Sequence, residues 1–135
     1  MRNSPLILIV DDDPGFLEIV STKMKRNGFL VAEAHDGKEA IEKAVNLKPD
    51  LILMDVNMPN ENGTEAVIDI LENPETKNIK VAFLTNQSEP WPAFKGKEIK
   101  GEAAEVAKEL GAVDFFNKTD DIDKTTERVK EILKK

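Results

Sequence analysis

Short apolar runs alternate with longer amphipathic segments along the chain. The short runs stop at polar residues, as central strands of a parallel sheet do, whereas the longer segments repeat their apolar residues at helical spacing. The runs predict strands at residues 6–10, 29–34, 51–54, 81–84 and 113–116. The remaining segments predict helices between Pro14 and Gly28, between Asp36 and Pro49, and at 65–71, 102–110 and 121–133. Regular alternation of strand and helix predicts an α/β fold, a doubly wound (βα)5 parallel sheet with right-handed connections.

Polar side chains follow four of the five predicted strands. Three aspartates, 11–13, follow the first strand, Asp55 ends the third, Thr85 follows the fourth and Lys118 follows the fifth. The carboxyl ends of parallel strands share one edge of the sheet, where ligands bind in open α/β folds. Asp13 precedes Pro14 and is explained as the N-cap of the first helix. A second and a third carboxylate are not needed for capping.

The remaining acids, Asp11, Asp12 and Asp55, would repel one another unless a cation neutralises them. Carboxylate oxygens without cysteine or histidine suit a hard cation such as Mg²⁺. The ammonium of Lys118 and the hydroxyl of Thr85 would add a charge and a donor for a phosphoryl group. These residues predict Mg²⁺-dependent phosphoryl chemistry, with Asp55 as the nucleophile.

Composition narrows the class of protein. The chain has 135 residues, no cysteine, one histidine and a formal net charge of −7. Its length fits one domain, residues 1–135, and the lack of cysteine excludes disulfides and thiolate metal sites. The acidic balance disfavours binding to nucleic acid or to an anionic membrane. No apolar run is long enough to span a bilayer, and the first residues do not resemble a signal peptide, so we expect a cytoplasmic domain.

Four segments stand in the order LILIVDDDP, LILMDVNMPNENG, VAFLT and GAVDFFNK. Together they resemble the receiver (CheY-like) domain of two-component response regulators, over essentially the whole chain. The resemblance implies a flavodoxin-like fold with strand order 2-1-3-4-5. It also implies that Asp55 accepts a phosphoryl group from a sensor histidine kinase or a phosphotransfer protein, and that the domain signals to a downstream protein effector.

The resemblance further assigns roles at the site. Asp12 and Asp55 would bind Mg²⁺ directly and Asp11 mainly through a water, while the backbone carbonyl of Asn57 would be another ligand. The domain would catalyse its own phosphorylation and dephosphorylation. Lys118 would pair with Asp55 and then with the phosphoryl oxygens, and Thr85 would turn its hydroxyl onto the phosphoryl group.

The sequence departs from the family pattern beside two of these residues. Thr119 follows Lys118 where the family usually has a proline after a cis peptide bond; without proline a cis bond costs about 2.5–4 kcal/mol, so we expect a trans bond and an altered loop. Asn86 follows Thr85 where a small residue is usual. Phe115 occupies the position of the family's conformational aromatic residue, and it can equally be a simple core residue.

A long polar stretch, residues 86–101, separates the fourth strand from the next helix. Two prolines within it disfavour regular helix, and it carries Trp91 and Phe94. Either this loop covers the cleft or contacts a partner, or the two rings fold back onto the domain as a satellite core.

The sequence alone leaves two other interpretations of the protein open. One is a small Mg²⁺-dependent phosphatase of haloacid-dehalogenase-like type, although Asp55-Val56-Asn57 lacks the second acid of the usual motif. The other is a receiver cut from a longer protein, or a receiver that has lost phosphorylation, rather than a receiver that acts alone. The intact set of acids, threonine and lysine disfavours a lost function.

Overall fold

The structure, a computed structural model, describes residues 4–55, 69–70, 72–85 and 111–134. It contains five strands: β1 (Leu6–Val10), β2 (Leu30–Ala34), β3 (Leu51–Asp55), β4 (Lys80–Thr85) and β5 (Asp114–Asn117). The described helices are α1 (Pro14–Arg26), α2 (Gly37–Leu47) and α5 (Ile122–Lys134). Residues 69, 70 and 72 are also helical; the first two lie within the predicted third helix, 65–71, and residue 72 is one position beyond it. The predicted helix at 102–110 and the loop at 86–101 lie outside the described residues.

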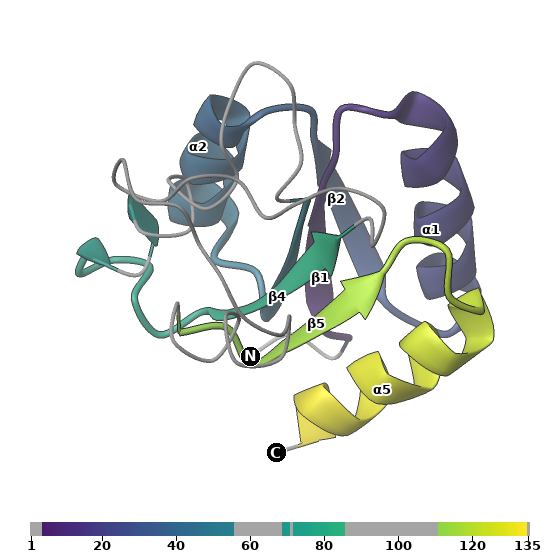
Figure 1. Cartoon of the computed structure of the whole chain (residues 1–135). Helices are drawn as coiled ribbons and strands as arrows, with labels where there is room; N and C mark the ends of the chain where they lie inside the picture. Colours follow the sequence, from purple (N-terminus) through teal and green to yellow (C-terminus); the bar gives the residue numbers. More distant parts are fainter. Residues whose placement is uncertain (1–3, 56–68, 71, 86–110, 135) are drawn as a thin grey trace, which may run out of the picture.

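The strands form one parallel sheet in the order β2-β1-β3-β4-β5, which confirms the predicted topology. Helices α1 and α5 lie together on one face and α2 lies on the other (Figure 1). The observed strands agree with the predicted runs to within a residue or two, and β5 starts one residue later than predicted. Fully buried β1 and β3 at the centre of the sheet explain why their runs are wholly apolar.

Two apolar clusters hold the helices to the sheet. Successive side chains of a strand point to opposite faces, so each central strand contributes to both clusters. On the α2 face, Leu8 and Phe83 belong to one cluster, with Ala40 and Ala44 of the helix. The cluster on the other face includes the side chains of Ile7, Ile9, Leu17, Val20, Met24, Leu53, Leu84, Phe116, Val129 and Ile132. The sheet is therefore packed on both faces behind the edge where its polar residues emerge.

Capping aspartates mark where α1 and α2 begin, and a glycine follows the end of α1. Asp13 caps α1, accepting hydrogen bonds from the backbone N–H groups of Gly15 (2.9 Å) and Phe16 (3.4 Å). Asp36 caps α2 by accepting a hydrogen bond from the N–H of Glu39 (2.8 Å), and the Asp13 cap confirms the prediction from the sequence. Beyond α1, Gly28 has a φ of 89°, a conformation that glycine adopts without steric cost.

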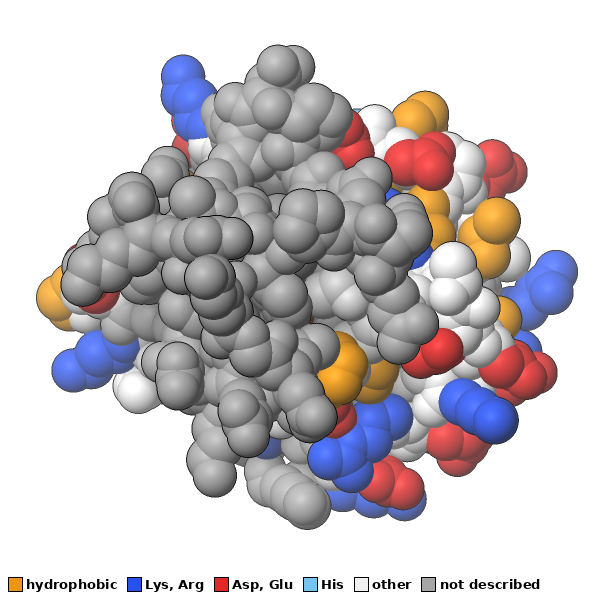
Figure 2. Space-filling model, in the orientation of Figure 1, with side chains coloured by type: hydrophobic (Ala, Val, Ile, Leu, Met, Phe, Trp, Pro, Cys, Tyr) orange, Lys and Arg blue, Asp and Glu red, His pale blue; other side chains and the backbone are white. Residues whose placement is uncertain are grey.

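The described surface mixes both signs of charge. Over α1 and α5, acidic and basic side chains are interspersed with a few hydrophobic ones (right of Figure 2). Ile19 on α1 is a large hydrophobic residue that is 61% exposed. Within the described residues, no helix is both long and apolar enough to cross a membrane.

Candidate functional site

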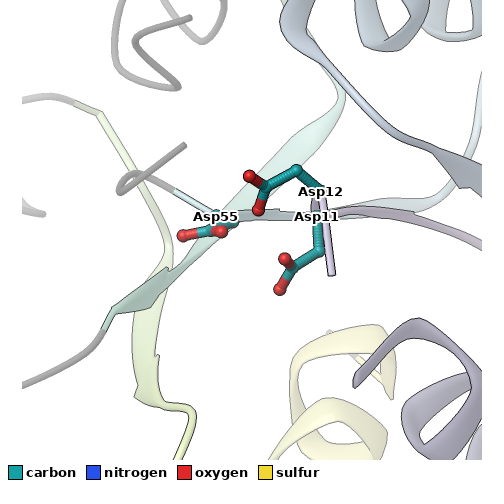
Figure 3. Close-up of side chains that lie close together, drawn as sticks. All are labelled: Asp11, Asp12 and Asp55. Atoms are coloured by element: carbon teal, nitrogen blue, oxygen red, sulfur yellow. The ribbon is translucent and has the colours of Figure 1, made fainter. Parts of the chain in front are cut away.

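The acidic residues emerge side by side because of the strand register. Val10 of β1 lies opposite Met54 of β3, so the residues that follow them, Asp11 and Asp55, leave the sheet at the same level. One carboxylate oxygen each of Asp11, Asp12 and Asp55 lies within 4.8 Å of the others. Figure 3 shows the three carboxyl groups gathered at the ends of β1 and β3. The predicted clustering of these acids is confirmed.

Lys118 reaches the cluster from the end of β5. Its Nζ lies 2.7 Å from Asp11 Oδ2 and 3.5 Å from Asp55 Oδ2. Asp11 and Asp55 are almost completely buried, so this ammonium compensates charge that solvent does not reach. The other oxygen of Asp11, Oδ1, accepts a hydrogen bond from the N–H of Asp13 at 2.9 Å.

Thr85 completes the edge on the β4 side. It pairs in register with Asn117, and its carbonyl accepts a hydrogen bond from the N–H of Lys118 at 2.8 Å. The Thr85 residue is 7% exposed. Predicted residues from four strand ends therefore meet here, whereas Asn57 and Asn86 lie outside the described residues. Phe115 is half-buried and packs against the cluster on the α2 face.

One contact of Lys118 and one pair of hydrogen bonds between its neighbours were not anticipated from the sequence. The Nζ of Lys118 lies over the ring of Phe16, 4.7 Å from the centroid. In the residues on either side of it, Asn117 Oδ1 accepts hydrogen bonds from Thr119 N at 2.9 Å and from Thr119 Oγ1 at 2.7 Å. The described residues contain no cis peptide bond, so the bond between Lys118 and Thr119 is trans, as expected. The Asn-x-Thr spacing was the available signal for this turn.

The pKa shifts at the site are those expected of a group of acids arranged to bind a cation. Burial raises the pKa of Asp11; the hydrogen bond from Lys118 offsets this in part, and the charge of Asp55 adds to it. Partial burial of its carboxyl group and the charge of Asp11 raise the pKa of Asp12. Burial lowers the pKa of Lys118, but the contacts with Asp11 and Asp55 outweigh it, so the net shift is upward.

The donor set suits a hard divalent ion. Three ionised carboxylates and one ammonium leave two uncompensated negative charges, which a single divalent cation neutralises. All three carboxylates offer oxygen, the donor that Mg²⁺ and Ca²⁺ prefer. The only histidine of the chain, His35, is exposed and pairs with Glu39 instead. The acidic triad is therefore arranged as a metal site.

A raised pKa in the folded state predicts how stability depends on pH. The folded protein holds protons on Asp12 more tightly than the unfolded chain, whose value is near 3.8. Without metal, this contribution to stability falls as the pH rises from about 4 through the folded pKa. We expect Asp12→Asn to match wild type near pH 4 and to be more stable by about 0.5–1 kcal/mol at pH 7.

The measurement is urea unfolding in EDTA at several pH values. Asp69→Asn, an exposed carboxylate away from the cluster, is the matched control and should show no such trend. A constant difference between Asp12→Asn and wild type from about pH 4 to 7 would contradict the repulsion described above.

Comparison with known proteins agrees with this geometry. Residues 7–130 match the family described as the response regulator receiver domain. The chain is 38% identical over 125 residues to the protein-glutamate methylesterase/protein-glutamine glutaminase of Thermotoga maritima, covering 87% of this chain and 32% of that protein. It is 30% identical over 131 residues to the DNA-binding dual master transcriptional regulator RpaA of Synechocystis, covering 97% of this chain and 50% of that protein. The chain thus spans a third to a half of the length of these relatives.

Solved structures give the same result. The chemotaxis protein CheY4 of Vibrio cholerae superposes with a TM-score of 0.79 at 26% identity, covering 96% of this chain and 98% of that one. A two-component response regulator of the LuxR family from Aurantimonas superposes with a TM-score of 0.78 at 26% identity, covering 98% and 86%. The match over most of the chain favours the receiver over the phosphatase interpretation. The chain belongs to the family of response regulator receiver domains, the signalling domains of two-component systems.

Proposed function

We propose that Asp55 accepts a phosphoryl group from a phosphohistidine, in a reaction that requires Mg²⁺. The observation that carries this proposal is the position of Asp55, whose carboxylate lies in the acidic triad and 3.5 Å from the Lys118 ammonium. Phosphoryl transfer needs an in-line nucleophile and cations beside the equatorial oxygens. A carboxylate between a metal site and a lysine meets both needs.

The transfer exchanges one bond for another. An oxygen of Asp55 forms a bond to phosphorus, and the bond from phosphorus to the imidazole nitrogen of the donor breaks. The nitrogen keeps the electron pair, and a proton on the other ring nitrogen of the donor lets it leave as a neutral imidazole. Asp55 then carries an acyl phosphate, which water can hydrolyse to restore the carboxylate.

Asp12 and Asp55 would bind the Mg²⁺ directly, with the carbonyl of Asn57, outside the described residues, as a further ligand. Both oxygens of Asp11 already have partners, Lys118 and the N–H of Asp13, which favours binding through a water. The bound ion supplies positive charge to the transferring group.

Lys118 neutralises a phosphoryl oxygen once the group has arrived. Its ammonium already lies within reach of Asp55, and its raised pKa keeps it charged throughout the neutral range. The Thr85 hydroxyl would donate to another oxygen, because Thr85 stands at the adjoining strand end. Movement of this threonine and of the β4–β5 edge would carry the signal to a protein effector.

The upstream partner that we propose is a sensor histidine kinase or a phosphotransfer protein, as the family implies. The cellular compartment that we propose for this protein is the cytoplasm. In the relatives from Thermotoga maritima and Synechocystis, the part that matches this chain belongs to a longer protein. One of those proteins is named as a methylesterase and glutaminase, and the other as a DNA-binding regulator. For this chain, output through protein contacts rather than nucleic acid agrees with its net charge of −7.

Incubation with a small phosphodonor, acetyl phosphate, tests the function. We expect wild type to gain the mass of one phosphoryl group with Mg²⁺ and far less of it in EDTA. Asp55→Ala should gain none, whereas Asp69→Asn should label like wild type. An unlabelled wild-type protein, or equal labelling of Asp55→Ala, would refute the assignment.

A further inference from the structure

Lys118 is held from two sides by residues outside the acidic triad. The ring of Phe16 lies against its ammonium, and the side chain of Asn117 closes the turn that carries its backbone. We propose that Phe16 and Asn117 are positioning residues that keep the Lys118 ammonium beside Asp55. This inference rests on the proposed function, because positioning Lys118 matters for catalysis only if Asp55 is phosphorylated.

Phe16 is placed by the start of α1. Asp13 caps the helix and accepts a hydrogen bond from the N–H of Phe16, which fixes the first turn beside the acids. The Phe16 side chain packs partly against the apolar cluster on the α1 and α5 face. Its ring faces the Lys118 Nζ at 4.7 Å, well inside the distance at which a cation is attracted to an aromatic face.

A neutral ring suits this place better than another carboxylate. The site already carries three acids, and a fourth would add repulsion. The contact with Phe16 also does not depend on which anion Lys118 pairs with. The ammonium can therefore shift from Asp11 or Asp55 toward a phosphoryl oxygen while the ring keeps it at the edge of the sheet.

Asn117 fixes the backbone on the other side. Its Oδ1 accepts from both the N–H and the hydroxyl of Thr119, which encloses Lys118 in a hydrogen-bonded turn. The N–H of Lys118 meanwhile donates to the Thr85 carbonyl. Thr119 can close this turn because it has the backbone N–H that a proline lacks. Hydrogen bonds here take the place of a rigid ring after the lysine.

The other end of the Asn117 amide supports this assignment. Nδ2 is buried and has no hydrogen-bond partner among the described residues. An unpaired buried donor is unfavourable, so packing alone would be better served by an apolar side chain. The two bonds that Oδ1 accepts account for an amide at this position.

The first experiment compares Phe16→Leu, Phe16→Tyr and Ile19→Ala. Leucine keeps apolar volume but removes the ring, tyrosine keeps the ring, and Ile19 is an exposed residue of the same helix. We expect Phe16→Leu to slow phosphorylation by acetyl phosphate by about threefold to tenfold, with Phe16→Tyr restoring most of the rate. The Mg²⁺ concentration for half-maximal rate should not change, and Ile19→Ala should react like wild type.

A spectroscopic readout separates positioning from general damage. In NMR spectra the ring current of Phe16 should shift the ε-methylene protons of Lys118 upfield in wild type and in Phe16→Tyr. In Phe16→Leu that shift should disappear. A wild-type rate together with an unchanged lysine resonance in Phe16→Leu would overturn the role of the ring.

The second experiment concerns the turn. Asn117→Val removes the acceptor but keeps volume, whereas Asn117→Ser keeps a neutral side-chain oxygen that can accept the bond from the Thr119 N–H. We expect the valine variant to lose at least threefold in rate with an unchanged KM for acetyl phosphate, and the serine variant to lose less than the valine variant. Equal rates for Asn117→Val and wild type would overturn the role of Asn117.

If Asp55 does not accept a phosphoryl group, the results would differ from those expected when only the positioning roles are wrong. Wild type would stay unlabelled, while the lysine resonance would still report whether Phe16 faces the ammonium. A labelled wild type whose Phe16 and Asn117 variants behave normally would instead refute the positioning roles alone.

Discussion

Replacement of Lys118 by alanine is expected to lower the free energy of unfolding at pH 7 by about 3 kcal/mol in the absence of metal. The Lys118 ammonium pairs with the buried carboxylates of Asp11 and Asp55. The substitution takes the ammonium away from these two acids, each about 1% exposed or less. Breaking a buried pair from one side usually costs more than the intact pair contributes.

The loss should shrink at low pH. When Asp11, whose pKa is raised by burial, binds a proton, part of the buried charge that Lys118 compensates disappears, so the difference between Lys118→Ala and wild type should narrow as the pH falls. Urea unfolding in EDTA measures the difference. Lys124→Ala, an exposed lysine on α5, is the control and should change stability by no more than about 0.5 kcal/mol. A similarly small effect for Lys118→Ala would show that the ion pairs contribute little.

Mg²⁺ is expected to stabilise the folded protein by about 2.7 kcal/mol at a concentration one hundred times its dissociation constant. For a chain of 135 residues this corresponds to a rise in Tm of about 10 °C. The stabilisation should be greater at pH 8 than at pH 5, because protons compete for Asp11 and Asp12, whose pKa values are raised.

Thermal unfolding with and without Mg²⁺ tests this expectation. Asp12→Asn and Asp55→Asn should lose most of the rise in Tm, since each removes a proposed direct ligand, whereas Asp69→Asn should keep it. An undiminished rise in Tm for both Asp12→Asn and Asp55→Asn would place the ion elsewhere on the protein.

Much of the site follows from strand ends. Asp11, Asp55, Thr85 and Lys118 could be placed together from the sequence because parallel strands deliver the residues that follow them to one edge of the sheet. The apolar runs that identify those strands in the sequence also bury them in the structure. One sequence pattern therefore predicts both the sheet and the edge at which the site lies. Asp13 could be separated from the other acids because a helix has one N-cap.

The neighbours of Lys118 could not be predicted in the same way. Phe16 lies at helical spacing among core residues, and that pattern does not say which polar group its ring edge or face will meet. Its contact depends on how α1 packs beside β5, two elements about a hundred residues apart. The turn closed by Asn117 depends on a side chain bonding its own backbone, which periodicity does not record.

The end of α2 is a second feature that could be predicted only in part from the sequence. Lys48, next to Pro49, ends the helix with a φ of 46°, in the left-handed region that glycine usually occupies. The proline predicted that the helix must stop, but the residue that would take the unusual conformation could not be read from composition alone.

The most direct test of the central claim is chemical mapping of the phosphorylated residue. After reaction with acetyl phosphate and Mg²⁺, borohydride reduces an aspartyl phosphate to homoserine, which peptide mass spectrometry locates in the sequence. We expect homoserine at position 55 in wild type and in Asp69→Asn, far less of it when Mg²⁺ is left out, and none when the phosphodonor is left out. Homoserine at position 11 or 12, or labelled protein without any homoserine, would contradict that claim.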